Sequence, residues 1–226
     1  MLKLTTELAQ TPLGPVEYAV LAQGTPVLVI HGTPGGVDAA ELMARFLPKD
    51  QFKVILASRP GYLRTELGDR RTIDQQADLL AALLDELCIA QAAVYTWSGG
   101  GPAGYRLAIR HPDKVMALVA FAAVCQAYRD THLTAGSRLM FTTSVGRWLM
   151  RALAALQPRQ YIAGALSSEG DLTKEQLAHQ VAAVFADETK RQFILDLGPT
   201  AEQGKDRRGG YDNDLEQFGR DASLGL

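Results

Sequence analysis

Apolar and polar residues alternate between two kinds of pattern over the first 125 residues. Continuous apolar runs bounded by glycine or proline indicate strands buried on both faces. Between these runs, apolar residues recur at helical spacing behind polar residues that can cap a helix. The predicted strands are 26–31, 52–57, 92–97 and 115–124, and the helical patterns begin near Asp38, Thr72 and Ser98. This alternation predicts an α/β fold with a mainly parallel sheet and helices on both faces.

The two ends of this pattern differ from its middle. Segments 5–9 and 16–22 are joined by a stretch rich in proline and glycine and predict an antiparallel pair of strands. After Cys125 only helical patterns follow, which predicts a helical insertion that sits on the sheet. Its expected helices are 139–156, 173–186 and 190–197, separated by Pro158, Gly170, Gly198 and Gly209-Gly210.

Charge distribution distinguishes two segments of the second half. The amphipathic segment 139–156 carries arginines beside its apolar face and predicts a lid helix that buries this face; the alternative is a helix lying on a membrane surface. The mixed charges of 205–208 predict a solvated loop.

Composition excludes several classes of protein. A chain of 226 residues, 47% of them apolar, supports one sizeable core. The net charge of −2 is spread evenly, without the basic excess that nucleic-acid binding needs. No signal peptide and no membrane span are recognisable, so we expect a cytoplasmic protein. Cys88 and Cys125 predict buried thiols and no disulfide. The sequence predicts no metal site and no cofactor.

Candidate chemistry centres on Ser98. A predicted strand ends at Trp97, glycines follow the serine at once, and a helical pattern begins within a turn. A serine at so sharp a turn is pushed clear of the backbone, beside helix N-terminal N–H groups that stabilise negative charge. Ser98 is therefore a candidate nucleophile. The alternative is an ordinary residue in a strand-to-helix turn.

Three motifs, each at the exit of a predicted strand, resemble the α/β-hydrolase family, and specifically its serine-nucleophile members with a helical cap. They are His31-Gly32-Thr33-Pro34, Arg59-Pro60-Gly61-Tyr62 and Trp97-Ser98-Gly99-Gly100. The resemblance implies a hydrolase core over residues 1–125, a cap over 126–217 and the start of a return to the core over 218–226. The aspartate nucleophile of dehalogenases and epoxide hydrolases of this fold is replaced by Ser98.

The resemblance also implies a role for each residue of these motifs. Ser98 would attack an acyl carbon, and the backbone N–H groups of Thr33 and Gly99 would form the oxyanion hole. His31, Gly32 and Trp97 would line the substrate site, with His31 as the structural histidine of its loop rather than the base. The family prefers glycine at the position of Thr96, so we expect a slightly strained turn there.

A base and an acid for Ser98 are not recognisable in the sequence. The family supplies them in the chain order serine, acid, histidine, on strands that would follow the cap, and those strands are missing from this sequence. His111 is predicted at the far end of the helix that starts at Ser98, about 20 Å away. His132, with Asp130 nearby, and His179 on the cap are the other candidates, and a surface position is the favoured interpretation for both.

Two functions remain open from the sequence. The first is a hydrolase that cleaves a carboxylic ester or a related small-molecule acyl compound through Ser98. The second is a non-catalytic or assembly-dependent hydrolase-like protein, in which strand 115–124 is an exposed sheet edge that a partner or a second copy covers. The substrate and the oligomeric state are not encoded in any motif.

Overall fold

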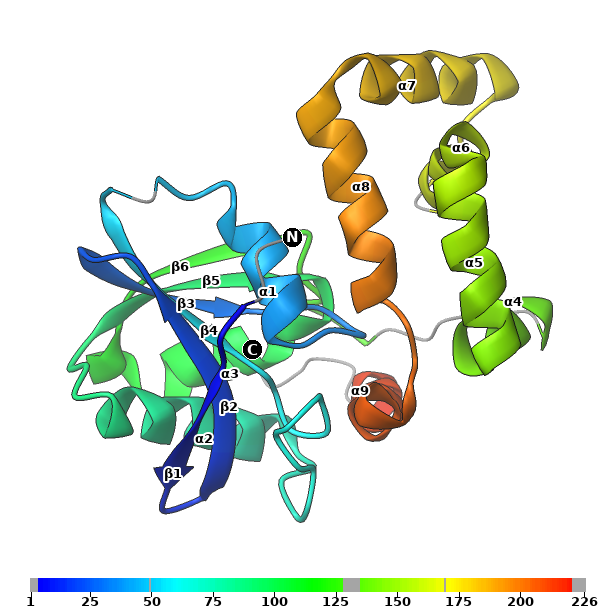
Figure 1. The fold of residues 1–226 in the computed structure, drawn as a ribbon. Coiled ribbons are helices and arrows are strands. Elements are labelled where there is room, and N and C mark those ends of the chain that lie inside the picture. The colour runs from blue at the N-terminus through cyan, green and yellow to red at the C-terminus, as the bar shows by residue number, and fades with distance from the viewer. Residues whose placement is uncertain (1–3, 49, 128–134, 169, 221–226) are drawn as a thin grey trace. The chain divides into compact units, whose positions relative to one another are not determined.

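A computed structural model describes residues 4–48, 50–127, 135–168 and 170–220 of the chain. Its contacts divide the chain into two units, residues 1–131 with 205–226 and residues 132–204. The first unit holds the sheet and the helices packed on it, and the second is helical (Figure 1).

The sheet of the first unit has six strands in the order β1-β2-β4-β3-β5-β6. β3 pairs in parallel with β4 and β5, and β5 pairs in parallel with β6, whereas β2 pairs antiparallel with β1 and β4. The mainly parallel sheet and the antiparallel N-terminal pair are therefore confirmed. The strands are β1 (Glu7–Thr11), β2 (Gly14–Leu21), β3 (Thr25–Ile30), β4 (Phe52–Ala57), β5 (Ala92–Trp97) and β6 (Val115–Phe121).

Helices cover both faces of this sheet. Side chains alternate between the faces of a strand, and Leu28 and Ile30 of β3 join one buried cluster with Leu80 and Leu107. Those two leucines belong to α2 (Ile73–Glu86) and α3 (Gly101–Arg110), which lie together in Figure 1. On the other face of β3, the side chains of Val27 and Val29 are also buried. On that face α1 (Val37–Ala44) packs against β3 and β4.

The start of α2 follows directly from its sequence. Thr72 accepts a hydrogen bond from the Gln75 N–H, and the Gln75 side chain accepts one from the Thr72 N–H in return. The helix start expected near Thr72 is confirmed, and this reciprocal pair, a capping box, satisfies two N–H groups that have no partner within the helix.

The second unit consists of five helices in the described residues 135–168 and 170–204. They are α4 (Ala135–Thr142), α5 (Ser144–Leu156), α6 (Pro158–Ser168), α7 (Lys174–Ala186) and α8 (Glu188–Thr200). The single helix expected over 139–156 is two helices, because Thr143 leaves helical geometry and caps α5 by accepting from the Gly146 N–H. Gly198, expected to separate helices, lies inside α8. A glycine is needed there because the Tyr161 hydroxyl occupies the space that a side chain would need.

The helix α9 (Lys205–Arg220) belongs to the first unit, although it follows the helices of the second unit in the sequence. The solvated loop expected over 205–208 is wrong, because Arg207 is 8% exposed within this helix. Gly209 and Gly210, expected to separate helices, lie in its interior. The sequence grouped 126–217 as one cap, whereas the contacts group α9 with the sheet.

The cysteines depart from expectation in one respect. Cys88 and Cys125 are free thiols, as expected, but both are exposed. Cys88 follows the end of α2 with a φ of 54°, in a turn that carries it away from the core. Over the described residues, no helix has the length and apolarity that a membrane crossing requires.

Candidate active site

The turn after β5 holds Ser98 in a strained backbone conformation. Ser98 has a φ of 47°, a value that side-chain-bearing residues adopt at a cost of about 1–3 kcal/mol. A 3-10 turn over Ser98–Gly100 leads directly into α3, and the Val124 N–H donates to the Ser98 carbonyl at 2.9 Å. Such strain concentrates at functional sites. The sharp strand-to-helix turn that the sequence predicts is therefore present.

Thr96, where the family prefers glycine, is accommodated by glycines on the helix side of the turn. A Cβ added to Gly104 would lie 3.1 Å from Thr96 Cβ, and one added to Gly100 would lie 3.0 Å from Thr96 Oγ1. The close packing of strand and helix is kept, but the Thr96 hydroxyl is buried and has no hydrogen-bond partner among the described residues.

The loop that follows β3 packs against this turn. A Cβ added to Gly32 would lie 3.2 Å from Ser98 Cβ and 3.4 Å from Trp97 Cε3, and one added to Gly99 would lie 2.1 Å from Thr33 Oγ1. A side chain at Gly99 would collide with Thr33, and one at Gly32 would be tightly packed against Ser98 and Trp97. The structure thus brings together Gly32, Thr33, Trp97, Ser98 and Gly99, all of them singled out in the sequence.

His31 serves the architecture of the loop. Its Nδ1 lies 2.7 Å from the Gly32 carbonyl, and its Nε2 accepts from the Arg59 N–H at 3.0 Å, which assigns the proton to Nδ1. Burial and then the nearby Arg59 charge lower the pKa of His31 well below its usual range. The side chain is fully buried and both nitrogens are engaged, so the ring is neutral and faces no solvent.

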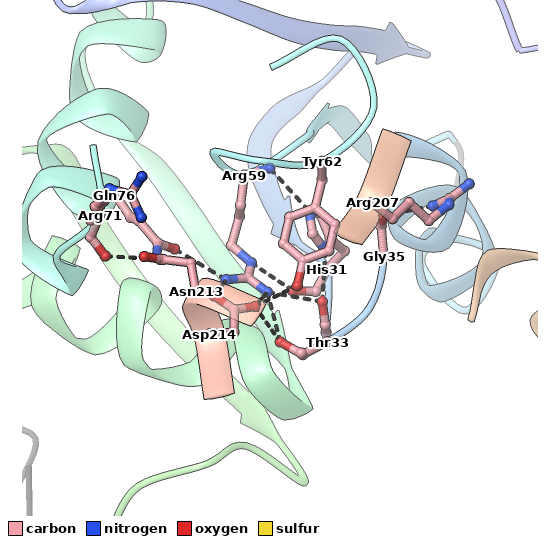
Figure 2. A network of polar contacts seen from close by, with 11 residues as sticks. His31, Thr33, Gly35, Arg59, Tyr62, Arg71, Gln76, Arg207, Asn213 and Asp214 are labelled. Atoms are coloured by element: carbon pink, nitrogen blue, oxygen red, sulfur yellow. Dashed lines mark hydrogen bonds and ion pairs between the residues drawn. The ribbon is translucent and has the colours of Figure 1, made fainter. Parts of the chain in front are cut away.

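A buried ion pair beneath this loop escaped the sequence analysis. The Arg59 guanidinium donates to both carboxylate oxygens of Asp214, at 2.9 and 2.6 Å, and each side chain is 1% exposed (Figure 2). The Tyr62 and Thr33 hydroxyls donate to Asp214 Oδ2 at 2.6 and 2.5 Å. Bidentate pairs of this kind have strong directional preference. One carboxylate therefore joins both loops that precede the serine turn in sequence.

Electrostatics keep the Arg59 guanidinium charged. Burial opposes the charge of Arg59, but the Asp214 carboxylate outweighs it, so that the pKa of Arg59 is raised. Burial first, and then the Asp214 charge, raise the pKa of Tyr62 well above its usual range. Tyr62 therefore remains a hydrogen-bond donor. The ring of Tyr62 also lies edge-on to His31, with 4.8 Å between ring centroids.

Further contacts dock α9 along the same loops. Arg207 donates to the Gly35 carbonyl at 2.5 Å and pairs with Asp38 at 2.6 Å. The Gly210 N–H donates to the Gly61 carbonyl at 2.9 Å, so that two backbones meet without side chains between them. At the C-terminal end of α9, Phe218 Cε2 lies 3.2 Å from the position of a Cβ on Gly99. Two adjacent glycines inside a helix are unfavourable unless a close approach requires them, and this signal could have revealed the docking of α9.

The described histidines of the first unit, His31 and His111, have partners other than Ser98. His111 ends α3 and pairs with Asp78 at 2.8 Å, and His179 is exposed in the second unit. His132 and Asp130 lie outside the described residues. Within the described ranges, no cluster of three or more histidine, cysteine or acidic side chains could hold a metal ion.

A sheet in this order, with a strained serine turn between β5 and α3, defines the α/β-hydrolase class of folds. The family model described as alpha/beta hydrolase fold matches residues 25–142, which is more than half of the chain. The chain belongs to the α/β-hydrolase family.

Individual relatives agree with this assignment. A solved α/β hydrolase fold protein from Nakamurella multipartita is 43% identical, with a TM-score of 0.92 over 97% of this chain and 76% of its own. The uncharacterized hydrolase YcgS of Bacillus subtilis (strain 168) is 31% identical over 146 residues, 63% of this chain and 51% of that protein. The pimeloyl-[acyl-carrier protein] methyl ester esterase of Chromobacterium violaceum is 38% identical over 114 residues, 49% of this chain and 41% of the esterase.

The length of the match is itself a finding. The chain spans between 34% and 51% of the length of the first curated relatives that it matches. In these relatives, between about half and two thirds of the length therefore lies outside the matched segment.

Proposed function

We propose that Ser98 is the nucleophile of a hydrolase that cleaves a carboxylic ester or a related acyl compound. The observation that carries this proposal is the strained turn at Ser98, with Gly32, Thr33 and Gly99 packed around it. The named esterase among the relatives supports an ester as the substrate class.

The chemistry follows from the groups around Ser98. The Ser98 hydroxyl gives up its proton as its oxygen forms a bond to the acyl carbon. The electrons of the carbonyl double bond move onto the carbonyl oxygen of the substrate. The N–H groups of Thr33 and Gly99 stabilise this oxyanion, and removing one such donor typically costs about 100- to 1000-fold in turnover. When the carbonyl double bond re-forms, the bond from the acyl carbon to the ester oxygen breaks, and the alkoxide takes up the proton that Ser98 has lost and leaves as the alcohol. Water then adds to the acyl carbon, the bond to the Ser98 oxygen breaks, and the acid leaves as Ser98 regains a proton. None of the described residues is assigned as the base.

A fluorophosphonate probe tests the nucleophile, since it reacts with an activated serine and releases fluoride. We expect the full chain to be labelled at Ser98, the Ser98→Ala variant to be unlabelled, and Ser167→Ala, at an exposed serine of α6, to be labelled like the parent. A folded parent chain that takes up no probe would refute the proposal for this chain.

A specific observation also favours the second function, an assembly-dependent hydrolase-like protein. Among the described residues, β6 pairs only with β5. Its side chains Met116, Val119 and Phe121 are 47%, 56% and 54% exposed. An unpaired, apolar edge strand is a template for pairing with a second chain. This function predicts that two copies meet at β6.

Sedimentation distinguishes this second function from a monomer. If β6 mediates assembly, the parent chain associates as its concentration rises by about a hundredfold, and Val119→Lys reduces that association. Leu13→Lys, at an exposed apolar residue of the β1–β2 hairpin, leaves it unchanged. A parent chain that stays monomeric and binds no dye for exposed apolar surface contradicts edge pairing.

A further inference from the structure

The peptide unit between Gly32 and Thr33 carries the N–H group to which the proposed function assigns oxyanion binding. A peptide unit is planar, so its carbonyl and its N–H point in opposite directions and cannot turn separately. The Gly32 carbonyl accepts from Arg59 Nη2 at 3.0 Å and lies 2.7 Å from His31 Nδ1. Whatever fixes Arg59 therefore also fixes the direction of the Thr33 N–H.

Asp214 is the group that fixes Arg59. The guanidinium has further acceptors in Gln76 Oε1 at 3.1 Å and the His31 carbonyl at 3.3 Å, but Asp214 is the anion paired with it in the described part of the chain. The Asp214 carboxylate accepts one hydrogen bond from each terminal nitrogen of Arg59. This pair of bonds sets the plane of the guanidinium group.

Asp214 also holds Thr33 directly. The Thr33 hydroxyl donates to Asp214 Oδ2 at 2.5 Å and accepts from Arg59 Nη2 at 2.9 Å. Both sides of the peptide unit are thus restrained, the carbonyl through Arg59 and the threonine through its own side chain (Figure 2). Loops that are not restrained in this way sample several backbone conformations.

We propose that Asp214 is the positioning residue of the oxyanion loop, the loop after β3 that contains Gly32 and Thr33. Asp214 lies on α9, which follows the helical unit in the sequence. It holds Arg59 and Thr33 so that the Thr33 N–H points toward Ser98. This role rests on the proposed function and deepens it, because it names the residue that preorganises the hole before substrate arrives. Asp214 is buried beneath the loop and touches no substrate, so it acts through Arg59 and Thr33.

The neighbouring residue provides a matched control. Asn213 is 2% exposed, and its side chain donates to the Arg71 carbonyl at 2.9 Å, away from the loop of Gly32 and Thr33. Asn213→Ala therefore removes a buried anchor of α9 without touching that loop, whereas Asp214→Asn removes the anion bound to Arg59 and Thr33.

The first experiment needs no chemistry at Ser98. Amide hydrogen exchange is measured on the full chain for the peptide that covers residues 31–37. We expect Asp214→Asn to raise exchange there by about tenfold or more, and Asn213→Ala to leave it close to the parent. Equal exchange in a folded Asp214→Asn chain overturns the inference, whatever the labelling result.

The second experiment measures the consequence at Ser98. The maximal rate of fluorophosphonate labelling and the half-saturating probe concentration are determined separately. We expect Asp214→Asn to lower the maximal rate by about 10- to 100-fold with little change in half-saturation, because a misplaced donor weakens only the charged transition state. An unchanged maximal rate, or a change in half-saturation alone, overturns the inference.

The inference stays testable if Asp214→Asn does not fold, and also if the parent chain takes up no probe. The uncompensated Arg59 charge can prevent Asp214→Asn from folding, and Thr33→Val then takes its place, since it cuts only the hydroxyl link and keeps the backbone N–H. Thr33→Val must raise exchange over 31–37, or the inference falls. If the parent chain does not label, the proposed function fails for this chain, and the exchange comparison still decides the inference.

Discussion

Ser98 and Thr96 lie two residues apart, and each holds an unfavourable feature of a different kind. Ser98 carries backbone strain, and Thr96 carries a buried hydroxyl without a partner. Backbone strain at the proposed nucleophile fits a functional constraint, because a serine at so sharp a turn is pushed clear of the backbone. The unpaired hydroxyl has no such purpose, so it can be removed without affecting the turn.

Replacing Thr96 by valine tests this difference. We expect Thr96→Val to raise the free energy of unfolding by about 1 kcal/mol, because it removes an unsatisfied buried hydroxyl and keeps the shape. Thr65→Val is the matched control, since the Thr65 hydroxyl is equally buried but accepts from the Glu17 N–H at 2.9 Å. This control should lose about 1–3 kcal/mol. Urea unfolding measures both, and equal losses would contradict the assignment.

His31 predicts a pH dependence of stability. Its pKa is lowered in the folded chain, first by burial and then by Arg59, so the folded state keeps the ring neutral. Below about pH 6.5 the unfolded chain takes up a proton that the folded chain refuses. The contribution of His31 to the free energy of unfolding is therefore fully present above this pH and is lost as the pH falls below it. The loss amounts to about 2 kcal/mol between pH 8 and pH 5.

Urea unfolding at several pH values measures this loss. Fluorescence of Trp97 in a Trp148→Phe background reports on the unit that holds His31, because the chain has two tryptophans, one in each unit. His111→Gln removes the histidine paired with Asp78 and should leave the loss in place. A free energy that stays flat from pH 8 to pH 5 would show that burial of His31 has no such cost.

At the scale of elements, α9 depends on a close approach between two backbones. Gly61 has a φ of 85°, and a Cβ there would lie 2.4 Å from the Gly210 nitrogen. Gly68, in the same connection, also has a positive φ of 50°, but the atom nearest to its Cβ position is 3.7 Å away. The two glycines share the conformational requirement and differ in the contact with α9.

Alanine at these two glycines separates conformation from contact. Gly68→Ala should cost about 1–3 kcal/mol, from backbone strain alone. Gly61→Ala should cost about 1–3 kcal/mol more, because its methyl group also displaces α9. The difference is read from urea unfolding followed by Trp97. Equal costs would mean that the docking of α9 does not depend on this approach.

Elements of the sheet were predictable from the sequence, and α9 was not. Apolar runs such as 26–31 and 92–97 predict strands because burial on both faces demands apolar side chains at every position. By contrast, α9 is polar over much of its length, and two of its buried side chains, Arg207 and Asp214, are charged. A charged residue predicts exposure unless its partner is known. The partners, Asp38 and Arg59, are 169 and 155 residues away in sequence.

The candidate site was predictable for the same reason as the strands. Gly32, Thr33 and Gly99 each follow directly on a predicted strand or on the serine, so parallel strands bring them to one edge of the sheet. Asp214 has no such local link. Its position depends on the chain returning from the helical unit, which no nearby residue encodes.

For the whole molecule, the division into two units has a measurable consequence. The buried cluster of the sheet uses residues between Ala9 and Leu107 only, all within the first unit. Replacing residues 132–204 by a flexible linker of about 20 residues, which spans roughly 25 Å on average, should leave this cluster intact. We expect a cooperative Trp97 transition to persist, with its midpoint shifted by less than about 8 °C.

The linker variant has an internal control. Leu28→Asp in the same background places a charge in the core of the sheet and should abolish the transition. Loss of cooperativity in the linker variant itself would mean that the helical unit stabilises the sheet.

The span between Arg59 and Asp214 also imposes an order on biosynthesis. A ribosome adds about 5–20 residues per second, so roughly 10–30 s separate the emergence of Arg59 from that of the carboxylate that pairs with it. During that interval the arginine cannot be buried without an uncompensated charge. The strands can assemble while the loops that follow them stay hydrated, and the loop of Gly32 and Thr33 gains its contacts with Asp214 only when α9 has been made. The order of synthesis thus places the docking of α9 after the strands β3 and β4 have been made.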